Sequence, residues 1–225
     1  QFMSDLYDSS IDSRYQAYWR DTWYATTATD KLSVGDTAFY LPKDAWSKAQ
    51  IDSKNYKVFN PEFSESLGSD YSTVSNRVFL HLKKFDDVKR ATMNEEKGTR
   101  DWVCFRAAEA YLLAGEAYYR AGDVDNALKY INTLRRNCAI EGKEKEMEIS
   151  ASDLSVDFIL DERARELCGE GKRWYDLKRL GKLIERTDLH NKKAHGNMKP
   201  FHELRPIPQS QIDRCTNVYP QNPQW

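Results

Sequence analysis

The sequence predicts a mainly α-helical fold in which an antiparallel helix pair is joined to long aromatic-rich loops and a few short strands. Three observations lead to this prediction. Residues 99–225 show apolar spacings of three and four residues with glycine stops, which is typical of helices. Residues 1–98 lack this periodicity. The first 90 residues also hold 16 of the 28 aromatic side chains. We therefore expect one contiguous domain, with an aromatic-rich loop region at 1–98 and a helical region at 99–225.

The composition excludes several classes of protein. The 34 Lys and Arg residues balance 35 Asp and Glu residues, so the net charge is -1 and no positive field attracts nucleic acid. No run of about 18 uncharged apolar residues is present, which excludes a membrane-spanning helix. The four cysteines are widely spaced and form no Cys-x-x-Cys pair, so neither a zinc knuckle nor a disulfide scaffold is expected.

The helix pair is predicted from its capping residues. Thr99 can cap a helix over 100–121, and Gly122 can end it in the left-handed conformation. Asp123 can then cap a second helix that runs to Cys138. Because the connection has one or two residues, the two helices must lie antiparallel.

The stretch at 110–130 resembles one tetratricopeptide unit. Its small residues, such as Gly115 and Ala127, stand where helices must approach closely, and Tyr118 and Tyr130 fill the space between them. No second copy occurs at a period of about 34 residues, and a free-standing array needs at least three. A helical hairpin within a larger domain is therefore favoured over a peptide-binding array.

Further elements are shorter. We expect a third helix to open at 152–155 and to end near Gly169, and a fourth over 174–180. Beyond His190 the tail reads as irregular, with one helical turn at 209–214.

The first region reads differently. Alternating apolar and polar residues predict extended segments at 37–41 and 77–82, and 44–50 can form two helical turns. Loops that carry many aromatic residues line a site or pack on another part of the protein.

A carboxylate pair raises the possibility of catalysis. Glu162 and Glu166 lie one turn apart on one helix face, and glycoside hydrolysis requires two carboxylates. Adjacent turns cannot place them on opposite sides of a bound bond. We expect structural ion pairs instead, Glu162 with Arg165 and Glu166 with Arg163 or Arg173.

A metal site and other catalytic motifs find no support. The spacing of His190, His195, His202 and Cys215 matches no zinc arrangement. No His-Glu-x-x-His, Gly-x-Ser-x-Gly or phosphate-binding glycine loop is present. We therefore predict no enzymatic activity, no metal and no cofactor.

Aromatic residues in the first region are candidates for sugar binding. The C–H faces of pyranose rings stack on indole and phenol rings, and neighbouring polar side chains bind hydroxyl groups. The alternative for each ring is the core, because aromatic side chains carry a large apolar area. Tyr40 and Tyr56 also carry phenol rings that can stack on a sugar. Our candidate ligand-binding residues are Trp19, Trp23, Tyr24 and Trp46.

Five motifs in order resemble the C-terminal part of the SusD/RagB family. Residues 98–112 resemble its R-D-x-x-x-x-R-x-A-E helix, and 127–135 its A-x-x-x-I-N-x-V-R helix. Residues 162–179 are similar to E-R-x-x-E-L-x-x-E-G-x-R-x-x-D-L-x-R. Pro206-Ile207-Pro208 and Gln221-Asn222-Pro223 follow.

The resemblance implies a helical fold with tetratricopeptide-like pairs, no enzymatic activity, and a surface that binds glycans. It also implies an outer-membrane, surface-exposed lipoprotein that associates with a TonB-dependent transporter of the SusC type. Family members are usually more than twice this length. We therefore expect this chain to be a C-terminal portion that contacts the membrane only through a lipid anchor it does not itself carry.

Two function hypotheses follow. The first is non-catalytic oligosaccharide binding at the bacterial cell surface, within a SusC/SusD-type nutrient uptake system. The alternative is a tetratricopeptide-like adaptor that binds a protein or peptide partner.

Overall fold

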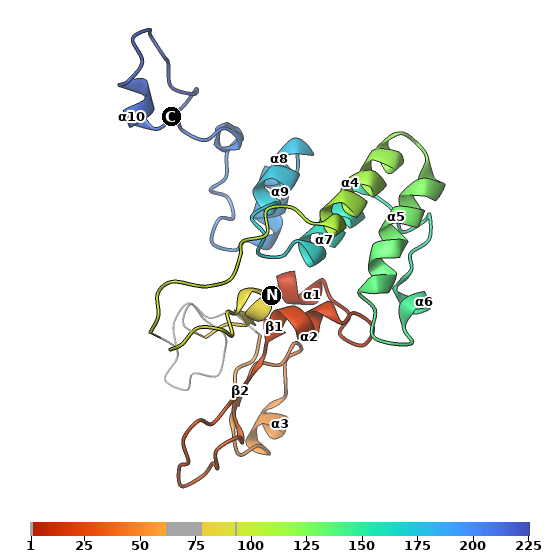
Figure 1. Cartoon of the computed structure of the whole chain (residues 1–225), viewed down its shortest axis with the longest axis vertical. Coiled ribbons are helices and arrows are strands. Elements are labelled where there is room, and N and C mark those ends of the chain that lie inside the picture. The colour runs from red at the N-terminus through yellow and green to blue at the C-terminus, as the bar shows by residue number, and fades with distance from the viewer. Residues whose placement is uncertain (1, 62–77, 93) are drawn as a thin grey trace. The chain divides into compact units, whose positions relative to one another are not determined.

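The computed structural model describes residues 2–61, 78–92 and 94–225 (Figure 1). The chain divides into two compact units, residues 1–170 and 171–225. The described elements confirm the prediction of a mainly helical fold with a few short strands. None of the described helices combines the length and the apolar composition that crossing a membrane requires.

The first part of unit 1 contains two small sheets. Strand β1 pairs antiparallel with β5, and β3 lies between an antiparallel β2 and a parallel β4. The predicted extended segment at 37–41 is confirmed. Of the segment at 77–82, the last two residues form β5 and Arg77 lies outside the described residues. The elements are α1 (Phe2–Asp5), α2 (Arg14–Tyr18), β1 (Trp19–Arg20), β2 (Thr22–Tyr24), β3 (Thr37–Tyr40), α3 (Lys48–Asp52), β4 (Lys57–Val58), β5 (His81–Leu82) and the 3₁₀ turn η1 (Lys83–Phe85).

The remaining elements are helical. In unit 1 they are α4 (Ala107–Arg120), α5 (Val124–Asn137), α6 (Glu144–Met147) and α7 (Val156–Glu166). In unit 2 they are α8 (Arg173–Arg179), α9 (Leu183–His190), η2 (Pro200–Glu203) and α10 (Gln209–Ile212). The predicted third and fourth helices and the turn in the tail correspond to α7, α8 and α10, whereas α9 was not anticipated.

The antiparallel pair α4 and α5 forms with the connection that Gly122 and Asp123 predict (Figure 1). Gly122 has φ +83°, and the side chain of Asp123 accepts a hydrogen bond from the backbone N–H of Asn126. Gly115 lies against Ile131, because a Cβ at Gly115 would be 2.7 Å from Ile131 Cγ1. Ile131 is fully buried and packs in a cluster with Ile159 of α7.

The start of α4 differs from the prediction. The helix begins at Ala107, seven residues later than expected, and Thr99 does not cap it. Arg106, the residue before the helix, has an extended backbone, and its Nε lies 2.9 Å from Glu170 Oε1. The hydroxyl of Thr99 donates to Asp87 Oδ2 at 3.0 Å instead. Contacts between distant segments therefore override the local capping signal.

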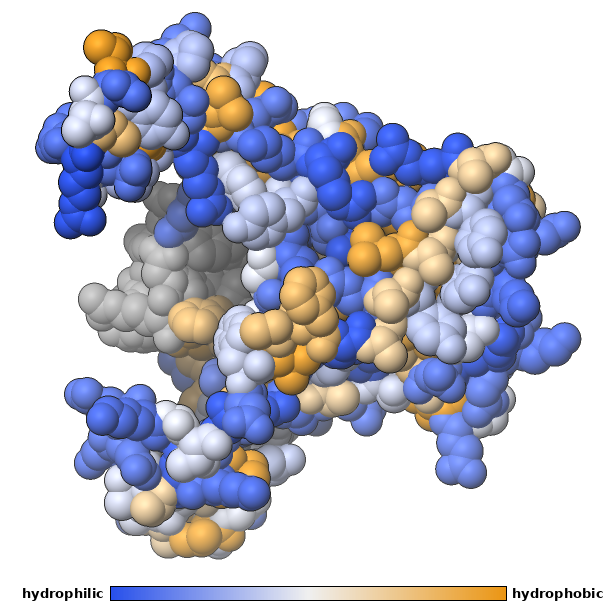
Figure 2. All heavy atoms as spheres, turned by 45° about the horizontal axis from the view of Figure 1, so that its top comes forward, coloured by the Kyte–Doolittle hydropathy of each residue, from blue (hydrophilic) through white to orange (hydrophobic). Residues whose placement is uncertain are grey.

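The surface drawn in Figure 2 is mostly hydrophilic. Apolar side chains form separate small patches on this face. This distribution is ordinary for a folded protein in water, where isolated apolar groups remain exposed.

Candidate functional site

The sheet β2–β3–β4 carries two pairs of aromatic side chains, one on each face, and each pair contains one predicted ligand-binding tryptophan. On the first face, Trp23 is opposite Phe39 and Phe39 is opposite Lys57. Directly opposed residues point to the same face of a sheet. The rings of Trp23 and Phe39 stack, with centroids 4.9 Å apart and planes inclined by 21°. The ammonium of Lys57 lies 5.5 Å from the ring centroid of buried Phe59.

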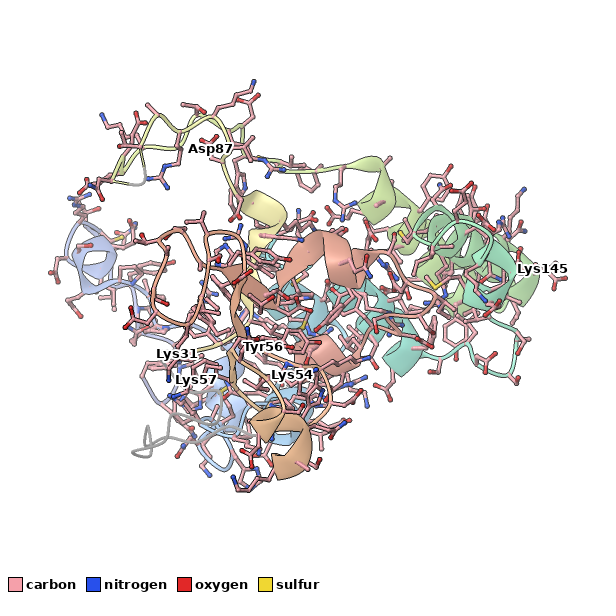
Figure 3. All side chains as sticks on the ribbon, turned by 90° about the horizontal axis from the view of Figure 1, so that it is seen from below. Lys31, Lys54, Tyr56, Lys57, Asp87 and Lys145 are labelled. Carbon is pink, nitrogen blue, oxygen red and sulfur yellow. The ribbon has the colours of Figure 1, made fainter. Side chains whose placement is uncertain are left out.

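The second face carries Tyr40 and Trp46. Tyr40 follows Phe39 in β3, so its side chain points to the opposite face. Its ring centroid lies 5.3 Å from that of Trp46, with planes inclined by 52°. The ammonium of Lys54 lies 5.6 Å from the Trp46 ring centroid, which is a cation–π contact. Figure 3 shows Lys54, Tyr56 and Lys57 close together on the segment from α3 to β4.

Hydrogen bonds fix the backbone at Trp46. Its N–H donates to Asn60 Oδ1 at 2.9 Å, and Asn60 Nδ2 donates to its carbonyl at 3.0 Å. The next residue, Ser47, caps α3 in a capping box with Gln50. These bonds hold the backbone of Trp46, and the contacts with Tyr40 and Lys54 hold its ring. The ring therefore needs little further ordering to bind a ligand.

The hydroxyl of Tyr40 is neutral at physiological pH. Burial and the nearby carboxylates of Asp21 and Asp44 raise the pKa of this phenol above its ordinary value. A neutral hydroxyl both donates and accepts hydrogen bonds. It therefore suits an uncharged, hydroxyl-rich ligand.

The four predicted residues do not form one platform. Trp19 lies in β1, opposite Leu82 of the other sheet. Tyr24 is 62% exposed at the end of β2, after a register shift. Trp23 and Trp46 belong to opposite faces of the three-stranded sheet.

Sequence reasoning missed the residues that support the two tryptophans, namely Phe39, Lys54 and Asn60. The alternation in 37–41 was a usable signal for Phe39, because it places Phe39 and Tyr40 on opposite faces. The pairing of β3 with β4 had no such signal, since parallel pairing depends on tertiary structure.

The predicted ion pair of Glu162 with Arg165 is confirmed, whereas Glu166 pairs with arginines other than the predicted Arg163 or Arg173. Glu162 is fully buried and accepts from Arg165 Nε at 2.9 Å. Glu166 pairs with Arg14 and Arg106, which come from segments distant in sequence, whereas Arg163 lies 3.7 Å from Glu109.

These charges make Glu162 unsuitable as a general acid. Burial opposes its ionisation, but the positive charges of Arg14 and Arg165 outweigh burial and hold the pKa of the carboxyl far below its ordinary value. A carboxyl that must donate a proton needs a raised pKa. The pair is part of the structural frame.

Among the residues that the structure describes, no group of three or more His, Cys, Asp or Glu side chains could hold a metal ion. All four cysteines lie in the described part of the chain, and no disulfide joins them.

A family model described as the SusD family matches residues 6–225 of this chain. The chain belongs to the SusD family.

Individual members of the SusD family show the extent of the similarity. SusD-like protein P25 of Formosa agariphila is 34% identical over 113 residues, which cover 49% of this chain and 21% of that protein. The starch-binding protein SusD of Bacteroides thetaiotaomicron is 31% identical over 122 residues, covering 52% of this chain and 20% of that protein. The matched part spans about a fifth of the length of these curated relatives. A solved SusD superfamily protein from Bacteroides thetaiotaomicron has a TM-score of 0.46 and 31% identity, covering 56% of this chain and 28% of that one.

Proposed function

We propose that this protein binds oligosaccharides without catalysis at the bacterial cell surface, as part of a SusC/SusD-type nutrient uptake system. Membership of the SusD family is the observation that carries the proposal. The name of one relative, a starch-binding protein, supports the same class of ligand. The aromatic pairs of the three-stranded sheet supply the chemistry.

Binding uses ring stacking and hydrogen bonds. A pyranose ring stacks on Trp46 or Trp23, each contact contributing on the order of 1 kcal/mol. The neutral Tyr40 hydroxyl and the Lys54 ammonium bind sugar hydroxyls. Specificity arises when the wrong sugar leaves one of these groups unpaired.

The roles divide along the chain. The loop region 1–98 supplies the ligand contacts of this site, and the helices from α4 onwards supply an inert frame. The buried pairing of Glu162 with arginines supports the second role, since a fully paired carboxylate has no proton to transfer.

Membership of the SusD family also supports a proposed partner and location. The protein is a lipid-anchored component of the outer membrane that delivers oligosaccharide to a TonB-dependent, SusC-like transporter. Co-purification of such a transporter with the tagged protein from its native outer membrane tests this part of the proposal. Recovery of the protein in the cytoplasmic fraction contradicts it.

Titration calorimetry tests ligand binding. The probes are hexasaccharides of starch, xylan, mannan and alginate, titrated against the protein and its Trp46→Ala and Trp23→Ala variants. Loss of a stacking contact should weaken binding about five-fold. Tyr175→Ala is the control, because Tyr175 is 64% exposed and lies in unit 2. Failure of every probe to bind overturns the proposed function, and unchanged affinity in both tryptophan variants removes the sheet from the site.

One observation favours the adaptor hypothesis as a second candidate. Helix α4 buries Glu109 and Glu116 while Tyr111, Leu113 and Tyr118 are exposed on it. Tyr111 and Tyr118 are seven residues apart and both contact Tyr130, so they lie on the same side of α4, where they can contact another polypeptide. A protein partner whose binding is lost in Tyr118→Asp, with oligosaccharide binding absent, would favour the adaptor.

A further inference from the structure

Trp102 is an exposed tryptophan whose ring is already oriented by a neighbour. Its side chain is 67% exposed, and it lies in the segment before α4. The ring is nearly parallel to that of Phe85 in η1, with centroids 5.8 Å apart and planes inclined by 18°. One side of the indole is thus supported while most of its surface meets solvent.

The ring of Phe85 packs against the backbone of Gly169. Gly169 has φ +77°, and a Cβ there would lie 2.5 Å from Phe85 Cε2, so the Phe85 ring lies directly against the backbone. The preceding residue, Lys84, donates through Nζ to the carbonyl of Glu166 at 2.9 Å and to the carboxylate of Glu170 at 2.6 Å. The η1 turn is therefore fastened to the buried frame.

The segment that carries Trp102 is fastened to the same turn. Arg100 Nη1 donates to the carbonyl of Lys84 at 2.7 Å, and its guanidinium lies 5.8 Å from the Phe85 ring centroid. The Thr99 hydroxyl donates to Asp87, which Figure 3 labels on the turn that follows η1. Both rings of the Trp102–Phe85 pair are thus positioned before any ligand arrives.

Polar groups next to this pair suit a hydroxyl-bearing ligand. Asp86 follows Phe85 and binds Arg20 at 2.7 Å and His81 at 2.8 Å. Their side chains are 33–45% exposed, so they can exchange hydrogen bonds with a ligand. Arg100 and Asp101 directly precede Trp102 and are also exposed. A flat supported ring bordered by charged groups favours a sugar over an apolar peptide.

We propose that Trp102, supported by Phe85, is a second carbohydrate-stacking site, separate from the aromatic pairs of the three-stranded sheet. This inference rests on the proposed function, because it assumes the same class of ligand. Its two rings come from other segments than Trp23, Phe39, Tyr40 and Trp46. Two sites on one protein let it hold separate units of one long glycan, which raises the overall affinity.

Residue-resolved footprinting tests the second site. The protein is oxidised by hydroxyl radicals with and without the hexasaccharide that binds best in calorimetry, and each tryptophan is quantified by mass spectrometry. At a saturating ligand concentration, we expect the ligand to lower oxidation of Trp102 both in the unsubstituted protein and in the Trp46→Ala variant. Trp102→Ala should weaken binding about five-fold, whereas Trp102→Tyr should retain most of the affinity because a flat ring remains.

The outcomes separate the two proposals. If the ligand binds and protects Trp23 or Trp46 but not Trp102, the second site is refuted and the proposed function stands. If no hexasaccharide binds, both fail. If Trp102 becomes protected without sugar as protein concentration rises, a second copy of the chain covers this ring and the inference is overturned. Circular dichroism of each variant confirms that it is folded.

Discussion

Arg14 Nη1 lies 2.8 Å from Glu162 Oε1 although 148 residues separate the two in sequence. The same nitrogen lies 2.9 Å from Glu166 Oε2. Both side chains of the Arg14–Glu162 pair are at most 3% exposed. This contact joins α2 to α7. A buried charge cluster therefore connects the aromatic-rich region to the helical region.

Removing Arg14 should destabilise the protein strongly. Arg14→Ala leaves Glu162 and Glu166 buried with one positive charge fewer, which costs about 3–5 kcal/mol. Urea unfolding followed by circular dichroism measures the loss. Lys48→Ala is the matched control, because the Lys48–Asp52 pair is exposed and its loss should cost less than about 1 kcal/mol. Equal losses in the two variants would contradict the importance of burial.

Acid should unfold the protein through the same cluster. Burial opposes ionisation of Glu162 and Glu170, but arginine and lysine partners outweigh it and lower the pKa of both carboxyls. The unfolded chain therefore takes up these protons more readily. The stabilising contribution is complete above the ordinary glutamate pKa of 4.5 and is lost as pH falls through the lower folded-state values.

The measurement is the free energy of unfolding as a function of pH. We expect it to fall below about pH 5, and Glu170→Gln should make the fall shallower because one linked proton is removed. A profile that is flat down to pH 3 in the unsubstituted protein would refute the linkage.

The cysteines should differ in reactivity. Burial raises the pKa of Cys138 to about 12, helped by the nearby carboxylate of Glu166. Burial also raises the pKa of Cys168, whereas Cys104 is exposed. Because the thiolate is the reactive form, iodoacetamide near pH 8 should modify Cys104 well before Cys138 and Cys168. Mass spectrometry of the digested protein measures the order, and unfolding in guanidinium should abolish it.

Gly115→Ala should weaken the contact between α4 and α5. The new Cβ would meet Ile131 Cγ1 at 2.7 Å, and overpacking of this kind costs about 1–3 kcal/mol. Ile131→Ala removes Cγ1 and Cδ1, the two side-chain atoms that the new Cβ would meet. In a double-mutant cycle of urea unfolding, the two substitutions together should cost less than the sum of their separate effects. Simple additivity would mean that the backbone relieves the contact in another way.

Asn60→Ala should weaken oligosaccharide binding without touching the stacking ring. The substitution removes both hydrogen bonds to the Trp46 backbone. We expect a loss of two-fold to five-fold, on the order of 0.5–1 kcal/mol, because the ring must then be ordered by the ligand. Asn60→Asp keeps the acceptor for the Trp46 N–H, so its affinity for the oligosaccharide should lie between those of the unsubstituted protein and Asn60→Ala. Calorimetry with the hexasaccharide probes measures all three proteins.

Local signals predicted much of the frame. Gly122 and Asp123 set the connection between α4 and α5 because both act through backbone atoms within a few residues. Ser155 opens α7 for the same reason, accepting from the N–H of Phe158. Thr99 failed as a cap because Asp87, twelve residues away, binds its hydroxyl instead.

The candidate site was predicted by residue type and not by arrangement. Trp23 and Trp46 were both named from their chemistry, yet strand register puts them on opposite faces of one sheet. In the sequence, Trp102 was noted only as part of the motif at 98–112. Its stacking on Phe85 depends on the η1 turn, which contacts Gly169 and Glu170.

By itself, the sequence determined the helical content, the short connection of the helix pair and the family, because periodicity, caps and motifs are properties of neighbouring residues. Only the tertiary structure decided that Arg14 reaches Glu162, that Arg14 and Arg106 neutralise Glu166, and which rings share a face. Arg14 and Glu162 are 148 positions apart and Arg106 and Glu166 are 60 apart, while the ring pairs depend on strand register, and no local pattern encodes either arrangement.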